Sequence, residues 1–194
     1  MGHIFYVMGK SASGKDTIYK ILRERLPQIR TVVPYTTRPI RAGEQDGVQY
    51  YFTDDSRLEE FKKSGKLIEA RAYHTVHGIW TYFTADDGQV DLSEGNYLGI
   101  GTLESYQKLK QYYGEEHVIP VYIEVEDGER LQRALLRERE QEKPKYEEMC
   151  RRFLADQEDF SEENIREAGI KLRFANENLE LCVENIIKYI NSLS

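Results

Sequence analysis

The chain has 194 residues, a length that suits one compact α/β domain. Its contents of 40% hydrophobic and 31% charged residues are ordinary for a globular protein, which argues against wholesale disorder. With 34 acidic and 27 basic residues the net charge is −7, so a dedicated nucleic-acid binder is not expected, although a small anionic ligand is not excluded.

The first elements predicted along the chain are a strand, a glycine-rich loop and a helix. The apolar run Ile4–Met8 ends at Gly9 and is typical of a buried parallel strand. From Lys15 onward apolar residues recur at helical spacing, and Pro27 ends the helix. The residues predicted on its buried face are Ile18, Ile21, Leu22 and Leu26.

The following segment, up to about residue 95, has a different pattern of short β-rich runs separated by turn residues. These runs are Thr31–Tyr35, Val48–Thr53, Lys66–Thr75 and Ile79–Thr84. A helix between them is predicted by an N-cap at Asp54 or Asp55 and by Gly65 as its terminator. The pattern predicts a small mixed α/β insertion, which we place at residues 33–95.

Beyond the insertion, strands and helices alternate again. Strands are predicted over Tyr97–Ile100, Val118–Val125 and Lys171–Ala175. Helices are predicted through Leu103, from a cap at Asp127, over about Tyr146–Arg166 and from Leu179 onward. Such alternation predicts a parallel sheet that is covered by helices on both faces. We therefore predict one α/β domain over 1–194, with a core of 1–32, 96–125 and 168–194 and a helical lid at 126–167.

Residues 9–17 fit the pattern G-x-x-x-x-G-K, between the first predicted strand and helix. Glycines let backbone N–H groups curl around a β-phosphate, and the helix N-terminus adds positive potential. Lys15 is expected to reach the β- and γ-phosphate oxygens. The pattern predicts a P-loop NTPase-type fold that binds ATP through Gly9, Ser11, Ala12, Ser13, Gly14, Lys15, Asp16 and Thr17.

The position after the loop lysine holds Asp16 instead of the usual Ser or Thr, and Thr17 supplies the next hydroxyl. A carboxylate is a hard oxygen ligand that binds Mg²⁺ directly or through water. We therefore expect Mg²⁺ as the cofactor, with ATP as co-substrate, and either Asp16 or Thr17 as its ligand.

Residues 36–52 form a second informative run, which reads T-T-R-P-I-R-A-G-E-Q-D-G-V-Q-Y-Y-F. Two arginines three residues apart, Arg38 and Arg41, are followed by Tyr50. Guanidinium groups bind phosphate through paired charge-assisted hydrogen bonds, and a tyrosine hydroxyl completes such a shell. The run is therefore a candidate site for the phosphate of an acceptor.

Together the two runs resemble the guanylate kinases, whose acceptor segment reads much like T-T-R-x-x-R-x-G-E-x-x-G-x-x-Y-x-F. The resemblance implies ATP-dependent phosphoryl transfer to a nucleoside monophosphate, GMP to GDP first of all. It implies that Arg38, Arg41 and Tyr50 hold the acceptor phosphate and that Glu69 contacts the base. After a short insertion around Tyr73–His77, the next run aligns with a family Tyr-Tyr-Gly-Ser/Thr segment, which makes Thr81 and Tyr82 acceptor-site candidates.

The resemblance extends over most of the chain. Arg133, Arg137 and Arg152 resemble the lid arginines that close over the transferring phosphoryl group, and Asn176 resembles an asparagine in the turn beside adenine. The catalytic residues so implied are Lys15, Arg38, Arg133, Arg137 and Arg152. The charge requirement agrees independently, because phosphoryl transfer needs cations around the γ-phosphate and exclusion of water.

The chain departs from the family in the residues that surround the base. Pro34 stands where members carry Ser, and Leu98–Glu104 contains no Asp, although members carry Asp residues there and one helps to read guanine. A kinase for another phosphorylated acceptor, such as ribose bisphosphate, is one alternative, because those phosphokinases share the Gly-Lys-Asp loop and also lack the strand Asp. A non-catalytic guanylate-kinase-like binding module is the other, although such modules are expected to lose the loop or the lid arginines retained here.

The sequence also carries expectations about location and partners. No run approaches the roughly 18 apolar residues that cross a bilayer, and residues 1–9 lack the features of an export signal. Cys150 and Cys182 are typical of idle thiols in a reducing compartment. We expect a cytoplasmic protein whose partners are ATP and a small phosphorylated acceptor, without nucleic acid or membrane; the sequence leaves a homodimer open.

Overall fold

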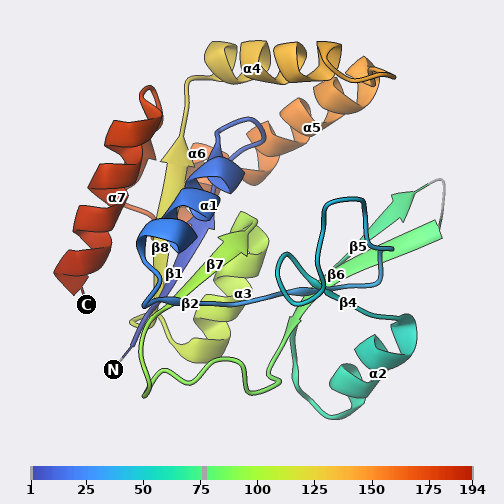
Figure 1. The fold of residues 1–194 in the computed structure, drawn as a ribbon, viewed down its shortest axis with the longest axis vertical. Coiled ribbons are helices and arrows are strands. Elements are labelled where there is room, and N and C mark those ends of the chain that lie inside the picture. The colour runs from blue at the N-terminus through green and yellow to red at the C-terminus, as the bar shows by residue number, and fades with distance from the viewer. Residues whose placement is uncertain (1, 76–77, 194) are drawn as a thin grey trace.

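The computed structural model describes residues 2–75 and 78–193. Its core is a five-stranded sheet in the order β2-β7-β1-β8-β9 (Figure 1). The strands are β1 (Ile4–Met8), β2 (Arg30–Thr31), β7 (Tyr97–Gly101), β8 (Val118–Glu124) and β9 (Arg173–Ala175). All of their pairings are parallel, so the predicted parallel sheet is confirmed.

Side chains that alternate along β1 divide the core into two apolar layers. Ile4, Tyr6 and Met8 pack with helices on one face, whereas Phe5 and Val7 pack with other helices on the opposite face. Burial on both faces is the reason why this strand is a continuous apolar run. The prediction of helices on both faces is confirmed by α1 (Lys15–Arg25), α3 (Leu103–Tyr113), α6 (Glu162–Glu167) and α7 (Leu179–Leu193).

Between β2 and β7 the chain forms a second sheet of four strands in the order β4-β3-β6-β5, to one side of the core (Figure 1). Its elements are β3 (Tyr35–Thr36), β4 (Tyr51–Phe52), α2 (Asp55–Lys63), β5 (Leu67–Thr75) and β6 (Gly78–Ala85). The Asp54 carboxylate caps α2 by accepting from the Arg57 backbone N–H, as the sequence predicts. Residues 76–77, which belong to the short insertion predicted around Tyr73–His77, lie outside the described residues.

The strand predicted over Thr31–Tyr35 is divided between the two sheets. β2 pairs with β7 in the core, and β3 pairs with β4 and β6 in the second sheet. Pro34 lies between them and has no backbone N–H to donate, which interrupts the ladder at this point. The chain therefore leaves the core sheet here and enters the second one.

The helix predicted over Tyr146–Arg166 is also divided. α5 (Tyr146–Asp159) has Phe160 as its C-cap, and Ser161 is the N-cap of the separate helix α6. The Phe160 ring stacks on Tyr122 of β8, with ring centroids 5.7 Å apart. This buried contact turns the chain from α5 back to the core.

α4 (Asp127–Arg139) and α5 lie beyond the carboxyl ends of β1 and β8 (Figure 1). α4 is capped by Glu126, not by the predicted Asp127, because the Glu126 carboxylate accepts from the Glu129 backbone N–H. Over the residues that the structure describes, no helix combines the length and the apolar character needed to cross a membrane.

Candidate active site

The loop between β1 and α1 has the backbone conformation of a phosphate-binding loop. Ala12 and Gly14 lie in the left-handed region, with φ of 62° and 85°. At Gly9 a Cβ atom would lie 2.5 Å from the carbonyl oxygen of Ile123, so the neighbouring strand leaves room for glycine only. The curled backbone and the N-terminus of α1 form a concave surface that suits an anion.

Asn176 supports this loop from the end of β9. Its side-chain amide donates to the carbonyl oxygen of Ser13 at 2.8 Å, and both residues are buried. A Cβ atom on Gly14 would lie 2.5 Å from the same amide nitrogen. The structure therefore brings Asn176 to the loop, where its side chain supports the backbone conformation.

Lys15 and Asp16 lie in the first turn of α1. The Lys15 ammonium donates to Oδ2 of Asp16 at 2.9 Å, and the Asp16 side chain is 82% exposed. Thr17 is exposed as well. Mg²⁺ in nucleotide sites is commonly held by one or two carboxylates together with waters and phosphates. The single exposed carboxylate of Asp16 fits that donor set, and no cluster of three His, Cys, Asp or Glu groups occurs among the described residues.

A charged network that the sequence motifs did not indicate connects the loop with α4 and α5. Arg130, whose side chain is 1% exposed, donates to Asp127 and to the carbonyl oxygen of Ser11, both at 2.8 Å. Asp156 of α5 accepts from the Ser11 backbone N–H at 2.9 Å. Lys10 adds an ion pair with Asp127 at 3.4 Å. The network joins the phosphate loop to the start of α4 and to the second half of α5.

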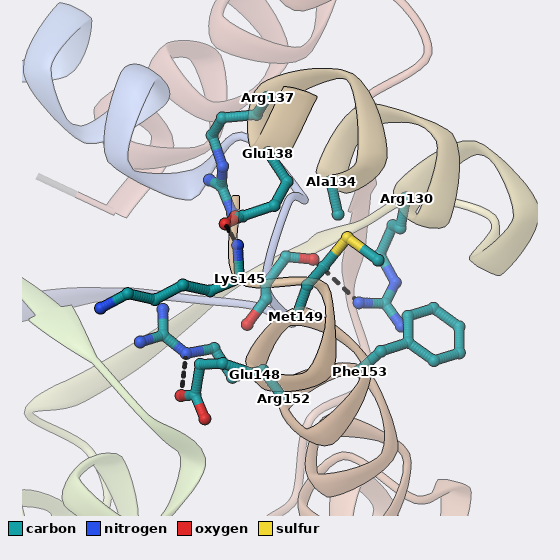
Figure 2. Close-up of a pocket in the computed structure, with 10 residues that line it drawn as sticks. Arg130, Ala134, Arg137, Glu138, Lys145, Glu148, Met149, Arg152 and Phe153 are labelled. Atoms are coloured by element: carbon teal, nitrogen blue, oxygen red, sulfur yellow. Dashed lines mark hydrogen bonds and ion pairs between the residues drawn. The ribbon is translucent and has the colours of Figure 1, made fainter. Parts of the chain in front are cut away.

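The three predicted lid arginines lie in two places. Arg133 donates to the carbonyl oxygen of Asn176 at 3.1 Å, next to the phosphate loop. Arg137 and Arg152 line a cavity of about 110 Å³ between α4 and α5, which Ser11 also lines (Figure 2). Arg152 donates to Glu148 at 2.7 Å. Hydrogen bonds from arginines, the one from Arg151 foremost, lower the pKa of Glu148 to about 2.

Arg38 is anchored at the centre of the acceptor side. Its side chain is 3% exposed, and its terminal nitrogens donate to both carboxylate oxygens of Glu44, at 2.9 and 2.8 Å. Its Nε donates to the Tyr82 hydroxyl at 3.1 Å, and its guanidinium lies 5.5 Å from the centroid of the Tyr50 ring. The hydrogen bond with Glu44 is the main reason why the pKa of Arg38 is raised.

Arg41 and two tyrosines complete this cluster. Arg41 is exposed, and its backbone N–H donates to Glu44 at 2.8 Å. The rings of Tyr50 and Tyr82 meet edge to face at 5.5 Å, and burial raises the pKa of Tyr50, so the Tyr50 hydroxyl stays protonated near neutral pH. Because Arg41 forms no side-chain ion pair with any described residue, its guanidinium is open to an incoming phosphate.

The β5–β6 hairpin places two of its predicted acceptor-site residues, Glu69 and Tyr82, on one face and Thr81 on the other. Glu69 is paired with Thr84, whose hydroxyl donates to Oε1 of Glu69 at 2.8 Å. Thr81 lies on the opposite face from Tyr82, because side chains alternate along a strand, and its backbone N–H donates to Thr37 at 2.9 Å. Thr84 therefore occupies the acceptor face, whereas the side chain of Thr81 does not join it.

The Tyr6 side chain, which comes from β1, packs against the carboxyl end of β7. Its hydroxyl is hydrogen-bonded to Ser105 at 2.7 Å. A Cβ atom on Gly101 would lie 2.1 Å from the Tyr6 hydroxyl oxygen, and one on Gly99 would lie 2.6 Å from its ring. No carboxylate side chain fits at either glycine while Tyr6 is present, which accounts for the absence of Asp from this strand.

We expect the substitution Gly101→Ala to lower the free energy of unfolding by about 1–3 kcal/mol, because the added methyl group overlaps the Tyr6 hydroxyl. Tyr6→Phe removes that oxygen and is expected to recover part of the loss in the double variant. Urea denaturation of the wild type, both single variants and the double variant measures the coupling. If Gly101→Ala lowered the free energy of unfolding equally in the wild type and in Tyr6→Phe, the contact with the Tyr6 hydroxyl would not be the cause of the loss.

The Arg38–Glu44 pair is expected to make stability depend on pH. The hydrogen bond from Arg38 is the main cause of the lowered pKa of Glu44. A carboxylate of this kind stabilises the fold above its unfolded pKa of 4.5, and the contribution is lost as the pH falls through the folded value. The melting temperature of the wild type is therefore expected to exceed that of Glu44→Gln above the unfolded pKa, with a margin that shrinks on acidification. A constant margin would refute the ionised pair.

Comparison with known proteins adds independent evidence. Residues 2–192 match the family model described as guanylate kinase. The guanylate kinases of Mycobacterium bovis and Mycobacterium tuberculosis are each 40% identical over 78 residues, which are 40% of this chain and 36% of theirs. That of Thermobifida fusca is 46% identical over 61 residues, 31% of either chain. The matched segments thus span about a third of the length of these curated relatives.

The fold has a counterpart among solved structures. The crystal structure of guanylate kinase from Anaplasma phagocytophilum superimposes with a TM-score of 0.64 and 22% identity, covering 98% of this chain and 85% of that one. The structural likeness supports the fold. The family model covers the phosphate loop, the second sheet and the helices α4 and α5. Since nearly the whole chain fits that model, the protein belongs to the guanylate kinase family.

Proposed function

We propose that the protein transfers the γ-phosphoryl group of ATP to a nucleoside monophosphate, with GMP as the acceptor, to give ADP and GDP. One observation carries the proposal: the chain combines a phosphate loop, with Ala12 and Gly14 in the left-handed region, with a buried Arg38 that is bonded to Glu44 and Tyr82 in the second sheet. Membership of the guanylate kinase family supports the choice of acceptor.

The proposed reaction needs positioning and charge stabilisation more than covalent catalysis. An oxygen of the acceptor phosphate attacks the γ-phosphorus, the bond to the β,γ-bridging oxygen breaks, and ADP leaves. A phosphate dianion has no proton to lose, so no general base is required. Lys15 and the loop N–H groups bind the phosphates of ATP, and Arg38, Arg41 and Tyr50 orient the acceptor phosphate.

We assign residues 126–167 to a lid and residues 33–95 to acceptor binding. Arg133 is already beside the phosphate loop, whereas Arg137 and Arg152 line the cavity between α4 and α5. To neutralise the transferring phosphoryl group, Arg152 has to exchange Glu148 for phosphate oxygens. The proposal therefore includes a closing movement that brings these arginines inward and excludes water.

Asp16 is the residue that would hold Mg²⁺, with Thr17 as the second candidate. When bound, Mg²⁺ neutralises charge on the β- and γ-phosphate oxygens. Lys15 already pairs with the Asp16 carboxylate, so this chain orients that ligand from within α1. We also propose a cytoplasmic location, where ATP and nucleoside monophosphates are available.

A coupled assay of ADP release tests the proposal with GMP, dGMP, AMP, UMP, CMP and ribose bisphosphate as acceptors. We expect turnover with GMP and dGMP well above that with the other four. Turnover with ribose bisphosphate alone would support a kinase for that acceptor. Silence with every acceptor, in protein that still binds ATP, would support a binding module and overturn the proposed enzyme.

A further inference from the structure

Arg71 is a cation on the acceptor face of the β5–β6 hairpin to which the proposed reaction assigns no role. It shares that face with Glu69 and lies opposite Tyr82 in the strand register. One terminal nitrogen of Arg71 donates to the Thr102 hydroxyl at 3.2 Å, at the carboxyl end of β7. Ligands of open α/β sheets bind at the carboxyl ends of the strands, so Arg71 lies where an acceptor would be recognised.

The half-buried Arg71 and the buried Glu69 form an ion pair whose two partners can each make further hydrogen bonds. Nε of Arg71 donates to Oε2 of Glu69 at 3.0 Å, and Thr84 donates to Oε1 at 2.8 Å. Each carboxylate oxygen therefore has one protein partner and keeps a further lone pair. Burial works to lower the pKa of Arg71, but the charge of Glu69, its hydrogen bond and the neighbouring tyrosines together outweigh burial and raise the pKa, so the guanidinium stays ionised.

The guanidinium also keeps unused donors. Within residues 2–75 and 78–193, the second terminal nitrogen of Arg71 donates to no protein acceptor. The hairpin thus presents N–H donors directly beside the acceptor lone pairs of Glu69. A 6-oxopurine offers the complementary pattern, with acceptors at O6 and N7 and a donor at N1, whereas a 6-aminopurine would place its amino group against the cation.

The site offers few hydrogen-bond acceptors to the 2-amino group of guanine. Gly99 and Gly101 carry no side chain, and Tyr6 occupies the space beside them, so the end of β7 supplies no carboxylate. Because Thr84 already satisfies Oε1 of Glu69, a base without a 2-amino group leaves no buried oxygen unpaired. The penalty that normally excludes an analogue lacking one polar group is therefore small here.

We infer that Arg71 is a specificity-determining residue, an inference that rests on the proposed function. Arg71 donates to the 6-oxo edge of the base, and Glu69 accepts from N1–H. The site then takes 6-oxopurine monophosphates as a class. Wild-type kcat/KM for GMP and IMP is expected to agree within about tenfold, and AMP is expected to be at least about 10³-fold poorer.

Arg71→Met tests the assignment, with Arg57→Met as the matched control. Arg57 lies on α2, where it is exposed and bonded to Glu60. We expect Arg71→Met to lower kcat/KM for GMP and IMP by about 10²-fold and to leave that for AMP nearly unchanged. Arg57→Met is expected to keep the wild-type preference. Arg71→Lys retains the charge without the planar fork and is expected to recover only part of the preference.

Thr84→Val provides a second, opposite test. Without the Thr84 hydroxyl, Oε1 of Glu69 has no protein partner, so the 2-amino group of GMP becomes the group that satisfies it. The preference for GMP over IMP is therefore expected to rise by about tenfold, which a merely structural loss would not produce.

Binding measured by calorimetry separates this inference from the proposed function. GMP binding that Arg71→Met weakens, in protein without turnover, would keep the inference and overturn the kinase. GMP turnover with an unchanged preference over AMP in folded Arg71→Met would overturn the inference and keep the kinase. Wild-type rejection of IMP by more than about 10²-fold would also overturn it. Absence of both binding and turnover with every purine monophosphate would overturn both.

Discussion

Replacement of Lys15 by Met is expected to lower kcat for phosphoryl transfer by about 10³-fold. Its ammonium lies in the first turn of α1, where loop N–H groups converge, and is the loop cation that can reach the β- and γ-phosphates. Negative charge on these oxygens shifts during transfer, so a cation held there lowers the barrier. Because its described partner is the exposed Asp16, the substitution leaves no buried charge unpaired.

Lys20→Met is the matched control for this expectation. Lys20 is exposed on the same helix and lies outside the phosphate loop. Rates at saturating ATP and GMP, together with melting temperatures, distinguish loss of catalysis from loss of the fold. If folded Lys15→Met kept its rate within about tenfold of the wild type, the loop would not bind ATP as proposed.

Arg130→Met is expected to cost about 3–5 kcal/mol of unfolding free energy, the largest expected effect on stability. The buried guanidinium bonds to Asp127 and to the Ser11 carbonyl oxygen, and lies 3.4 Å from Asp156. It also lies 4.7 Å from the centroid of the Phe153 ring. Its removal leaves the half-buried Asp156 carboxylate without its cation and leaves Asp127 with Lys10 as its remaining cation, which Met cannot compensate.

Arg166→Met serves as the control, because Arg166 is exposed and its ion pair with Glu163 is long, at 4.0 Å. Urea denaturation gives the free energies, and Asp156→Asn in the Arg130→Met background tests the network itself. The half-buried Asp156 carboxylate is destabilising without its cation, so neutralising it should relieve part of the loss. Strictly additive losses from the two substitutions would mean that the residues do not act together.

The parts of the fold that the sequence predicted well are those that local chemistry determines. Ile4–Met8 is apolar throughout because both faces of the strand are buried, and α1 follows from a glycine loop and regular apolar spacing. The break between α5 and α6 could not be predicted from local pattern, since it depends on Phe160 packing against Tyr122 of a distant strand.

The same division applies to the candidate site. The phosphate loop and the Arg38–Arg41 run are contiguous motifs, so spacing alone reveals them. In the sequence, nothing distinguishes Arg130 from the other arginines of its charged helix. Only its hydrogen bond to the carbonyl oxygen of Ser11, which is distant in the chain, places it beside the phosphate loop. The sequence predicts Thr81 as an acceptor-site residue and does not indicate Thr84. The strand register, which pairs Glu69 with Thr84, decides which side chain shares a face with Glu69.

The most direct test of the proposed function follows the transferred group itself. ATP labelled at the γ-phosphate is incubated with the protein, Mg²⁺ and GMP, and the products are separated. The expected result is label in the terminal phosphate of GDP, formed in equal amount with ADP, and little label in inorganic phosphate. Label that appears only in inorganic phosphate, or stays in ATP although GMP is bound, would contradict phosphoryl transfer to GMP.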